Sequence, residues 1–375
     1  MTVPTLDVRD LRVAVMDADE LVHRDQDRLF IEPYGPFLPR GFVPAVRGVS
    51  FRVDPGEVLA IVGESGSGKS LSVLGALGLL TPGAAVLGGT VDCEGVRLRP
   101  TAHLVRNRNR WWRRWRKRRR KAPFMEELLD DAYRTTLGTR IGVLFQSPVA
   151  SWTPAELIGE QAAEAVAEHS DLSKEEITDR VLDALGETQL PAKRGYLSFR
   201  HEMSRGQAQR AMLAAALVKA PSLLIADEPL TGLDAPVAAA ICELMRDMQR
   251  KRNMAMILVT HDLATVASMA DRVAVMYGGR IIEEGPIDEI FRRPRHPYTD
   301  GLLGSLPSRG VDRLRPIAGS PPKITRIPDD SCAFAPRCPH VTAACTSALP
   351  GLERIGTAVA ACVHKAQLDL PGIGS

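Results

Sequence analysis

Eight consecutive residues in the first quarter of the chain have the composition of a phosphate-binding loop. They fit the pattern G-x-x-x-x-G-K-[ST] and directly follow an apolar run of strand length, Val58–Val62. The loop residues are Gly63, Glu64, Ser65, Gly66, Ser67, Gly68, Lys69 and Ser70. Glycines let backbone N–H groups point at phosphates, Lys69 can reach the β- and γ-phosphate oxygens, and the Ser70 hydroxyl can bind Mg²⁺. Because strand, loop and a helical pattern occur in the required order, we predict a nucleoside triphosphate site rather than a simple Gly/Ser-rich turn.

Two adjacent acids, Asp227 and Glu228, follow a second apolar run at 222–226. Carboxylates at the tip of a strand suit two tasks in phosphoryl transfer. One can bind Mg²⁺ directly or through water, and the other can accept a proton from the attacking water. We therefore predict Asp227 as an Mg²⁺ ligand and Glu228 as the general base. Taken alone, the pair is also compatible with a solvated strand end.

Other polar residues stand at the ends of predicted strands or at the start of a predicted helix. Gln146 and His261 each follow an apolar run of strand length. A helix is predicted to begin near Ser204, with Gly206 and Gln207 in its first turn. Each feature alone has a common structural explanation, a loop hydrogen bond for Gln146 or His261 and an N-cap for Ser204. Their order along the chain is more informative than any one of them.

In this order, the elements resemble those of ATP-binding-cassette (ABC) ATPases over about residues 43–290. The resemblance implies a Walker A loop that binds ATP, a glutamine loop, a signature motif, a Walker B strand and a switch histidine. It implies that the signature residues contact ATP held by a second subunit, and that Asp234 lies in the loop that couples the two subunits. The implied catalytic residues are Gln146, Glu228 and His261; the Mg²⁺ ligands are Ser70, Gln146 and Asp227; the signature contacts are Ser204, Gly206 and Gln207. Arg205 stands where the family usually has a glycine, and we expect it to be tolerated.

Adenine in these ATPases usually stacks on an aromatic ring ahead of the phosphate loop. Tyr34, Phe37 and Phe42 are candidates. We predict Phe42 as the stacking residue, with plain packing as the alternative. Strands are predicted at 6–13 and 45–53.

Between Gln146 and Asp227 the sequence pattern is helical. Two segments, Thr153–Glu156 and Ser173–Glu176, fit the capping box that begins a helix. The resemblance places here, at about 147–219, the helical subdomain with which ABC ATPases grip a membrane partner.

The C-terminal part narrows the resemblance. The motif His-Pro-Tyr-Thr at 296–299 precedes a Pro-rich stretch and a set of cysteines. This tail resembles that of the ATPase subunits of dipeptide, oligopeptide and nickel importers. The resemblance then covers nearly the whole chain apart from residues 16–41 and a basic segment at 106–121.

Four of the six cysteines lie close together in the tail, spaced C-x5-C-x6-C-x16-C. They are Cys332, Cys338, Cys345 and Cys362. In the reducing compartment that we expect, such residues are more often thiols or metal ligands than disulfides. The spacing lacks the C-x2-C pairs of structural zinc sites, whereas ligation of an iron–sulfur cluster by four thiolates is compatible with irregular spacing. The resemblance favours a [4Fe–4S] cluster; Zn²⁺ and free thiols in a packed tail are the alternatives.

Length and composition agree with a globular protein of two parts. The chain has 375 residues, 45% hydrophobic and 25% charged, and is long for a single core. We predict an α/β fold in which an ABC-type P-loop ATPase core, with an antiparallel β edge and the inserted α-helical subdomain, spans 1–293. A small cysteine-containing extension follows at 294–375.

The N-terminus is too charged for a signal peptide, and no run is long enough to span a bilayer. We expect a peripheral protein at the cytoplasmic face of the cell membrane.

The segment 106–121 contains eleven Lys and Arg residues with interleaved tryptophans, although the formal net charge of the chain is only +3. The excess of positive charge is therefore confined to this segment. Such a segment suits a polyanion, either the anionic inner leaflet of a membrane or nucleic acid. A solvated insertion is the third explanation.

These features predict an ATPase subunit of an ABC importer of peptides. Its expected partners are two membrane permease subunits, a second ABC ATPase subunit that is identical or paralogous, and, indirectly, an extracytoplasmic solute-binding protein. The alternative is a soluble ABC ATPase that acts on nucleic acid, which only the basic segment supports. Such enzymes usually carry two cassettes or a long coiled coil, and this chain has one cassette and no heptads, so the importer is favoured.

Overall fold

The structure is a computed structural model that describes residues 3–16, 42–81, 83–98, 131–147, 151–306 and 315–372. The basic segment 106–121, Tyr34 and Phe37 lie outside the described residues. Contacts divide the chain into two compact units. The first unit is built from 1–6, 53–62 and 134–273, and the second from 7–52, 63–133 and 274–375.

The first unit is built on four parallel strands in the order β3-β8-β7-β6. Their bounds are β3 (Val58–Val62), β6 (Ile141–Leu144), β7 (Leu223–Asp227) and β8 (Ala255–Thr260). Every residue of β3, β7 and β8 is buried. Short, wholly apolar strands of this kind form parallel sheets that are covered on both faces.

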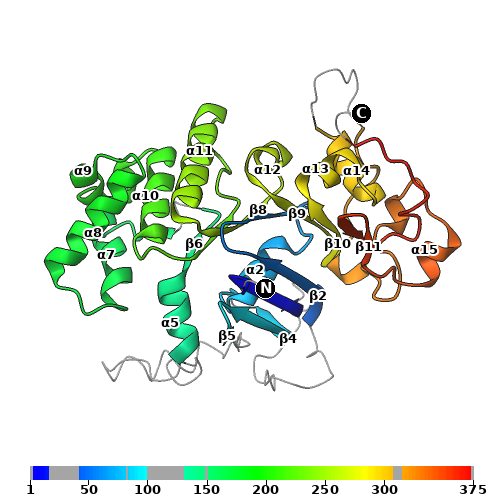
Figure 1. The fold of residues 1–375 in the computed structure, drawn as a ribbon, viewed down its shortest axis with the longest axis horizontal. Helices are drawn as coiled ribbons and strands as arrows, with labels where there is room; N and C mark the ends of the chain where they lie inside the picture. The colour runs from blue at the N-terminus through cyan, green and yellow to red at the C-terminus, as the bar shows by residue number, and fades with distance from the viewer. Residues whose placement is uncertain are drawn as a thin grey trace, which may run out of the picture. The chain divides into compact units, whose positions relative to one another are not determined.

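Helices of the first unit complete its core. They are α5 (Asp131–Arg140, which begins just before this unit), α7 (Ile158–Ala167), α8 (Lys174–Glu187), α9 (Ala192–Tyr196), α10 (Arg205–Leu217), α11 (Ala235–Arg252) and α12 (Leu263–Met269), with a 3-10 turn η1 (Arg200–Glu202). Helices α7, α8, α9 and α10 pack on one another (Figure 1). Their buried residues, such as Ile158, Leu185 and Leu213, form one cluster with Leu224 and Leu258 of the sheet. Burial of each such side chain stabilises the fold by about 1.5–3 kcal/mol.

One predicted helix start is confirmed and the other is wrong. Ser173 caps α8 through a reciprocal capping box with Glu176. At Thr153, however, the chain forms a turn, and α7 begins only at Ile158. The side chain of Gln161 bonds both the N–H and the C=O of Thr153. Leu157 forms a bridge with Phe199, so the backbone ahead of α7 stays extended.

The second unit contains a separate sheet of strand order β2-β1-β4-β5 and the helix α2 (Lys69–Ala76). The strands are β1 (Leu6–Met16), β2 (Phe42–Val53), β4 (Ala84–Cys93) and β5 (Val96–Leu98), the last two antiparallel. Strand β2 begins at Phe42, three residues before the predicted start, and β1 continues to Met16, three residues beyond the predicted end.

The C-terminal part of the second unit follows β9 (Arg272–Tyr277) and β10 (Arg280–Pro286). Its elements are α13 (Ile287–Arg292), α14 (Pro297–Gly304), η2 (Ile324–Arg326), η3 (Ala335–Arg337), α15 (Ala343–Ser347), β11 (Glu353–Ile355) and β12 (Ala358–Ala360). Strand β12 pairs antiparallel with both β10 and β11, and thereby attaches the tail to the strands before it. The α/β fold class is confirmed. Within the described residues, no helix combines the length and apolarity needed to cross a bilayer.

Candidate functional site

The phosphate loop lies between β3 and α2, and its backbone requires glycine. Gly63, Gly66 and Gly68 have φ values of 151°, 80° and 101°, a region that other residues rarely adopt. A Cβ at Gly63 would also lie 2.3 Å from the carbonyl oxygen of Met276. Gly68 is the N-cap of α2, so the helix N-terminus opens directly from the loop. This is the arrangement that binds phosphate anions.

Two buried polar side chains line this loop. Lys69 is only 7% exposed, and its Nζ donates hydrogen bonds to the carbonyl oxygens of Gly63 (2.7 Å) and Glu64 (3.1 Å). The Ser67 hydroxyl is buried and makes no hydrogen bond to any described residue. Because buried polar groups are rarely left without partners, this hydroxyl fits a site that receives a polar ligand. Ser70 is half-buried in the first turn of α2.

Residues that follow β9 in the sequence form hydrogen bonds with Glu64 and Ser67 of the phosphate loop. The Glu64 N–H donates to the Tyr298 hydroxyl (2.8 Å), and the Arg337 guanidinium donates to both Glu64 carboxylate oxygens (2.6 and 3.0 Å). The Gly279 N–H donates to the Ser67 carbonyl oxygen (3.0 Å). These contacts could not be predicted from the sequence; the only signal for Tyr298 was its place in the His-Pro-Tyr-Thr motif.

In the first unit, three predicted site residues follow neighbouring parallel strands. Gln146 lies two residues beyond β6, Asp227 ends β7, and His261 follows β8. Since Leu144 pairs with Ala226 and Asp227 pairs with Val259, the three strands end at one edge of the sheet. Asp227 is 5% exposed, whereas Gln146 is exposed.

Glu228 is held in one orientation at this edge. Its Oε1 lies 2.8 Å from Nδ1 of His261, and its Oε2 accepts a hydrogen bond from the Thr231 hydroxyl (3.2 Å). An ionised carboxylate can only accept, so Nδ1 of His261 is the donor in this contact. The Glu228 side chain is 11% exposed and that of His261 is 61% exposed.

The signature residues form the start of α10. Ser204 is the N-cap: its hydroxyl accepts from the Gln207 N–H (3.2 Å), and the Gln207 side chain accepts from the Ser204 N–H (2.9 Å). A Cβ at Gly206 would lie 2.7 Å from Cγ1 of Val237 on α11. The close approach of α10 to α11 therefore favours glycine at this position. Ser204 and Gln207 are exposed.

Arg205 joins the signature helix to the loop that contains Asp234. Its Nη1 donates to the Gly232 carbonyl oxygen at 3.0 Å. Asp234 is exposed and occupies the N-cap position of α11 without a side-chain capping bond. The arginine side chain therefore extends along the loop within its own unit.

Phe42, the predicted adenine-stacking residue, is the first residue of β2 and is 9% exposed. It packs in a small core with Ala14 and Ala85. This burial favours the packing explanation for Phe42 over stacking on a base.

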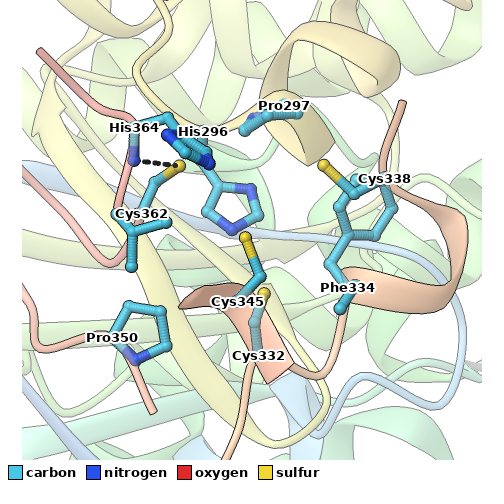
Figure 2. Close-up of a pocket in the computed structure, with 11 residues that line it drawn as sticks. His296, Pro297, Cys332, Phe334, Cys338, Cys345, Pro350, Cys362 and His364 are labelled. Carbon is cyan, nitrogen blue, oxygen red and sulfur yellow. Dashed lines mark hydrogen bonds between the residues drawn. The ribbon is translucent and has the colours of Figure 1, made fainter. Parts of the chain in front are cut away.

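All four cysteines of the tail line one pocket (Figure 2). None of them is in a disulfide. The pocket is also lined by Phe334, by Pro350 and by two histidines, His296 and His364. The structure thus brings together residues that are up to 30 positions apart in the sequence, as the cysteine prediction requires.

Two of the four thiols in this pocket accept hydrogen bonds from the backbone. The N–H groups of His340 and His364 donate to the sulfurs of Cys338 and Cys362, each at 3.4 Å. Burial raises the pKa of Cys338 to about 11, and it also raises the pKa values of Cys332 and Cys362. Thiolates at this position therefore require a compensating cation. Among the described residues, no three His, Cys, Asp or Glu side chains converge closely enough for one metal ion.

A buried polar pair fixes the segment that carries Tyr298. Glu283 accepts hydrogen bonds from the N–H groups of Arg295 and His296, and Nδ1 of His296 accepts from the Tyr298 N–H (3.1 Å). Burial lowers the pKa of His296 to about 3 and raises that of Glu283 to about 7. A neutral His296 is what the capping bond to Tyr298 requires, because only an unprotonated Nδ1 can accept.

Comparison with known proteins matches both parts of the chain. The family "ABC transporter" matches residues 46–231, and the family "Oligopeptide/dipeptide transporter, C-terminal region" matches residues 282–345. The dipeptide transport ATP-binding protein DppD of Bacillus subtilis is 39% identical over 315 residues, which are 83% of this chain and 86% of the relative. The oligopeptide transport ATP-binding protein OppD of the same organism is 41% identical over 302 residues, 79% and 76% of the two chains.

Solved structures share the fold. A dimeric ATP-binding cassette in a post-hydrolysis state bound to ADP and Pi superposes with a TM-score of 0.54 at 20% identity, over 75% of this chain and 98% of the other. The protein cbiO1 of Clostridium perfringens, part of the ABC transporter complex cbiONQ, superposes with a TM-score of 0.54 at 25% identity. The match covers 77% of this chain and 90% of cbiO1. The cassette fold predicted from the sequence is confirmed.

Proposed function

The chain belongs to the ABC transporter ATPases with an oligopeptide/dipeptide transporter C-terminal region, and we propose on this premise that it hydrolyses ATP to energise a peptide importer. The observation that carries the proposal is the presence of both family matches in one chain, at 46–231 and 282–345. Relatives that cover most of the chain are named for dipeptide and oligopeptide transport. We assign residues 1–293 to the nucleotide-binding domain, with its helical subdomain at about 147–219, and 294–375 to the extension.

The phosphate loop binds the triphosphate in this proposal. Backbone N–H groups of residues 63–68 and the α2 N-terminus bind the phosphate oxygens. When ATP binds, Lys69 gives up its hydrogen bonds to the loop carbonyl oxygens and donates instead to oxygens of the β- and γ-phosphates. The oxygen donors proposed for Mg²⁺ are the Ser70 hydroxyl, the Gln146 amide and the Asp227 carboxylate, the ligand type that Mg²⁺ prefers. When bound, Mg²⁺ neutralises charge that develops on the phosphates.

Glu228 is the proposed general base. Oε1 accepts the Nδ1–H of His261 and Oε2 accepts the Thr231 hydroxyl, so the carboxylate has a fixed direction. Each oxygen retains a further lone pair, and one of these takes a proton of the attacking water. The water oxygen bonds to the γ-phosphorus as the bond from this phosphorus to the β–γ bridging oxygen breaks, so that ADP leaves and phosphate is released. His261 keeps Nε2 exposed for contact with the phosphoryl group that is transferred.

Two ATPase subunits are needed for a complete site in this proposal. Ser204, Gly206 and Gln207 at the exposed start of α10 contact the ATP of the second subunit, and Asp234 couples the two sites. The second subunit is identical or paralogous. The helical subdomain binds two permease subunits at the cytoplasmic face of the membrane, and a solute-binding protein delivers the peptide on the other side. For the basic segment 106–121, contact with anionic lipid is one of three explanations, beside nucleic acid and a solvated insertion.

We propose that the cysteine pocket holds a [4Fe–4S] cluster. Four thiols line one pocket, and backbone N–H groups donate to two of the sulfurs, a common environment of cluster ligands. When bound, the cluster would supply the cationic iron that four thiolates, two of them buried and two half-buried, need, and it would fix the fold of the tail.

Uptake and hydrolysis test the proposed function together. A bacterial strain that lacks the gene should lose uptake of labelled di- or oligopeptides, and the wild-type gene should restore it. A gene that encodes Lys69→Ala should not restore uptake, because the protein no longer binds MgATP. Restoration by Lys69→Ala, or normal peptide uptake in the deletion strain, would contradict the proposal.

A further inference from the structure

Arg337 lies in the cysteine tail, between Cys332 and Cys338, but its side chain reaches the phosphate loop. Its two terminal nitrogens donate to the two carboxylate oxygens of Glu64 at 2.6 and 3.0 Å. The Arg337 side chain is 6% exposed and that of Glu64 is 24% exposed. Bidentate pairs of this geometry are among the strong hydrogen bonds of proteins, and shielding from water strengthens them further.

A second contact between the cysteine tail and the phosphate loop runs through aromatic rings. Tyr277, Tyr298 and Phe334 pack on one another with centroids 4.6 to 5.4 Å apart. Phe334 lines the cysteine pocket, while the Tyr298 hydroxyl accepts the Glu64 N–H. Arg337 also donates to the Tyr277 hydroxyl at 3.3 Å. The cysteine tail thus contacts Glu64 at two points. Arg337 bonds the Glu64 side chain, and Phe334 packs on Tyr298, which bonds the Glu64 backbone.

A third contact runs through the turn after β9. A Cβ at Gly278 would lie 2.9 Å from the Ala333 side chain, so tail and turn are in close contact. The next residue, Gly279, donates its N–H to the carbonyl oxygen of Ser67 in the phosphate loop. Three separate contacts thus connect the tail to the loop.

The charge of Glu64 gives the ion pair a consequence for nucleotide binding. Glu64 is an acid within a loop whose ligand is strongly anionic, and like charges at short range repel more strongly where water is partly excluded. Arg337 neutralises this carboxylate and draws it away toward the tail. Without Arg337 the loop would present an uncompensated negative charge beside the triphosphate.

We propose that Arg337 compensates the negative charge of Glu64 in the phosphate loop, and that the folded cysteine tail thereby raises the affinity of the loop for ATP. The inference rests on the proposed role of the loop in ATP binding. Arg337 does not touch the reacting atoms in this proposal, so its loss weakens binding of MgATP and leaves the rate at saturating MgATP nearly unchanged.

Binding of a fluorescent nucleotide, TNP-ATP, to the full-length purified protein tests the proposal. We expect Arg337→Ala to raise the Kd about tenfold, which corresponds to about 1.4 kcal/mol. The double variant Arg337→Ala/Glu64→Gln should recover most of the affinity, because the uncompensated charge is gone. Amide hydrogen exchange in a peptide that covers residues 60–70 should be faster in both variants, since the side-chain clamp is missing from each. Arg354→Ala, an exposed arginine of the same tail, is the matched control and should change neither readout.

Two results would overturn the inference. One is an Arg337→Ala protein with wild-type affinity and wild-type exchange in the loop. The other is a loss of affinity that Glu64→Gln does not relieve. If Arg337→Ala fails to fold, Arg337→Gln is compared in the same way, with and without Glu64→Gln. Lys69→Ala separates this inference from the proposed function: wild-type TNP-ATP binding by Lys69→Ala would reject the loop as the nucleotide site, whereas weak binding by Lys69→Ala with normal binding by Arg337→Ala rejects only the role of Arg337.

Discussion

The Nδ1 atom of His261 lies 2.8 Å from Oε1 of Glu228, and this contact joins the ends of two neighbouring parallel strands. Glu228 has φ of 49°, in the left-handed region that a non-glycine residue adopts only when its surroundings hold it there. The Glu228 N–H donates to the carbonyl oxygen of Val259 at 2.8 Å, which fixes the residue to the adjacent strand. The backbone conformation and the two side-chain contacts of Glu228 thus give its carboxylate one direction, which is the geometry that the proposed general base needs.

Substitution of Glu228 by Gln should separate binding from hydrolysis. The amide oxygen of Gln can still accept the His261 hydrogen bond, but it cannot take a proton from water. We expect the ATPase rate to fall by about 100- to 10,000-fold, the range that a general base contributes, while ATP affinity is retained. Phosphate release and TNP-ATP titration measure the two quantities, and ATP-bound dimer should accumulate in size-exclusion chromatography. Glu243→Gln, at an exposed position of α11, is the control; hydrolysis near the wild-type rate in Glu228→Gln would reject the assignment.

Substitution of Arg205 by Ala should affect association of two subunits more than binding of ATP. The change removes the hydrogen bond to the Gly232 carbonyl oxygen, which is worth about 0.5–1.5 kcal/mol. We expect ATP-dependent dimerisation to weaken several-fold in a Glu228→Gln background, with the Kd for TNP-ATP in the monomer unchanged. Arg210→Ala is the matched control, because Arg210 bonds the Thr188 carbonyl oxygen from the same helix. Stronger dimerisation by Arg205→Ala would show instead that the arginine hinders closure.

Substitution of Cys338 or Cys345 by Ser should remove the metal from the tail. Protein purified without oxygen should be brown and contain about four irons per chain, as expected for a [4Fe–4S] cluster with four thiolate ligands, and either variant should lose both the colour and the iron. Cys242→Ser, outside the tail, should keep them. About one zinc per chain with no iron would identify a different metal at the same site. Absence of both metals after anaerobic preparation would favour free thiols.

The sequence was sufficient to predict features that depend on neighbouring residues. The apolar run Val58–Val62 is β3 without any shift of its bounds, and the capping box at Ser173 is formed as predicted. No helix begins at Thr153, because the Gln161 side chain on α7 bonds the Thr153 backbone and Phe199 pairs with Leu157 in an extended bridge. Local propensity does not include such tertiary contacts.

The same limit explains what was missed at the site. Residue types and order predicted Glu228 and His261, but their mutual contact depends on strand pairing between β7 and β8. Glu64 fits a position of the loop motif that accepts any residue, and its partner Arg337 is 273 residues away. A sequence motif describes which residues meet a ligand and gives no information about distant side chains that hold the motif in place.

Replacement of residues 106–121 by a Gly/Ser linker of equal length tests the function of the basic segment. If the segment contacts the inner leaflet, the wild-type subunit should bind vesicles that contain phosphatidylserine, since each Lys or Arg near the surface is worth about 1 kcal/mol. The linker variant should lose this binding and retain its affinity for TNP-ATP. High salt should release the wild-type protein, because the Debye length falls to roughly 3 Å at 1 M. Affinity for DNA or RNA with steep salt dependence, together with an altered ATPase rate, would support a nucleic-acid role instead. A linker variant with unchanged vesicle binding, nucleic-acid binding and peptide uptake would identify a solvated insertion.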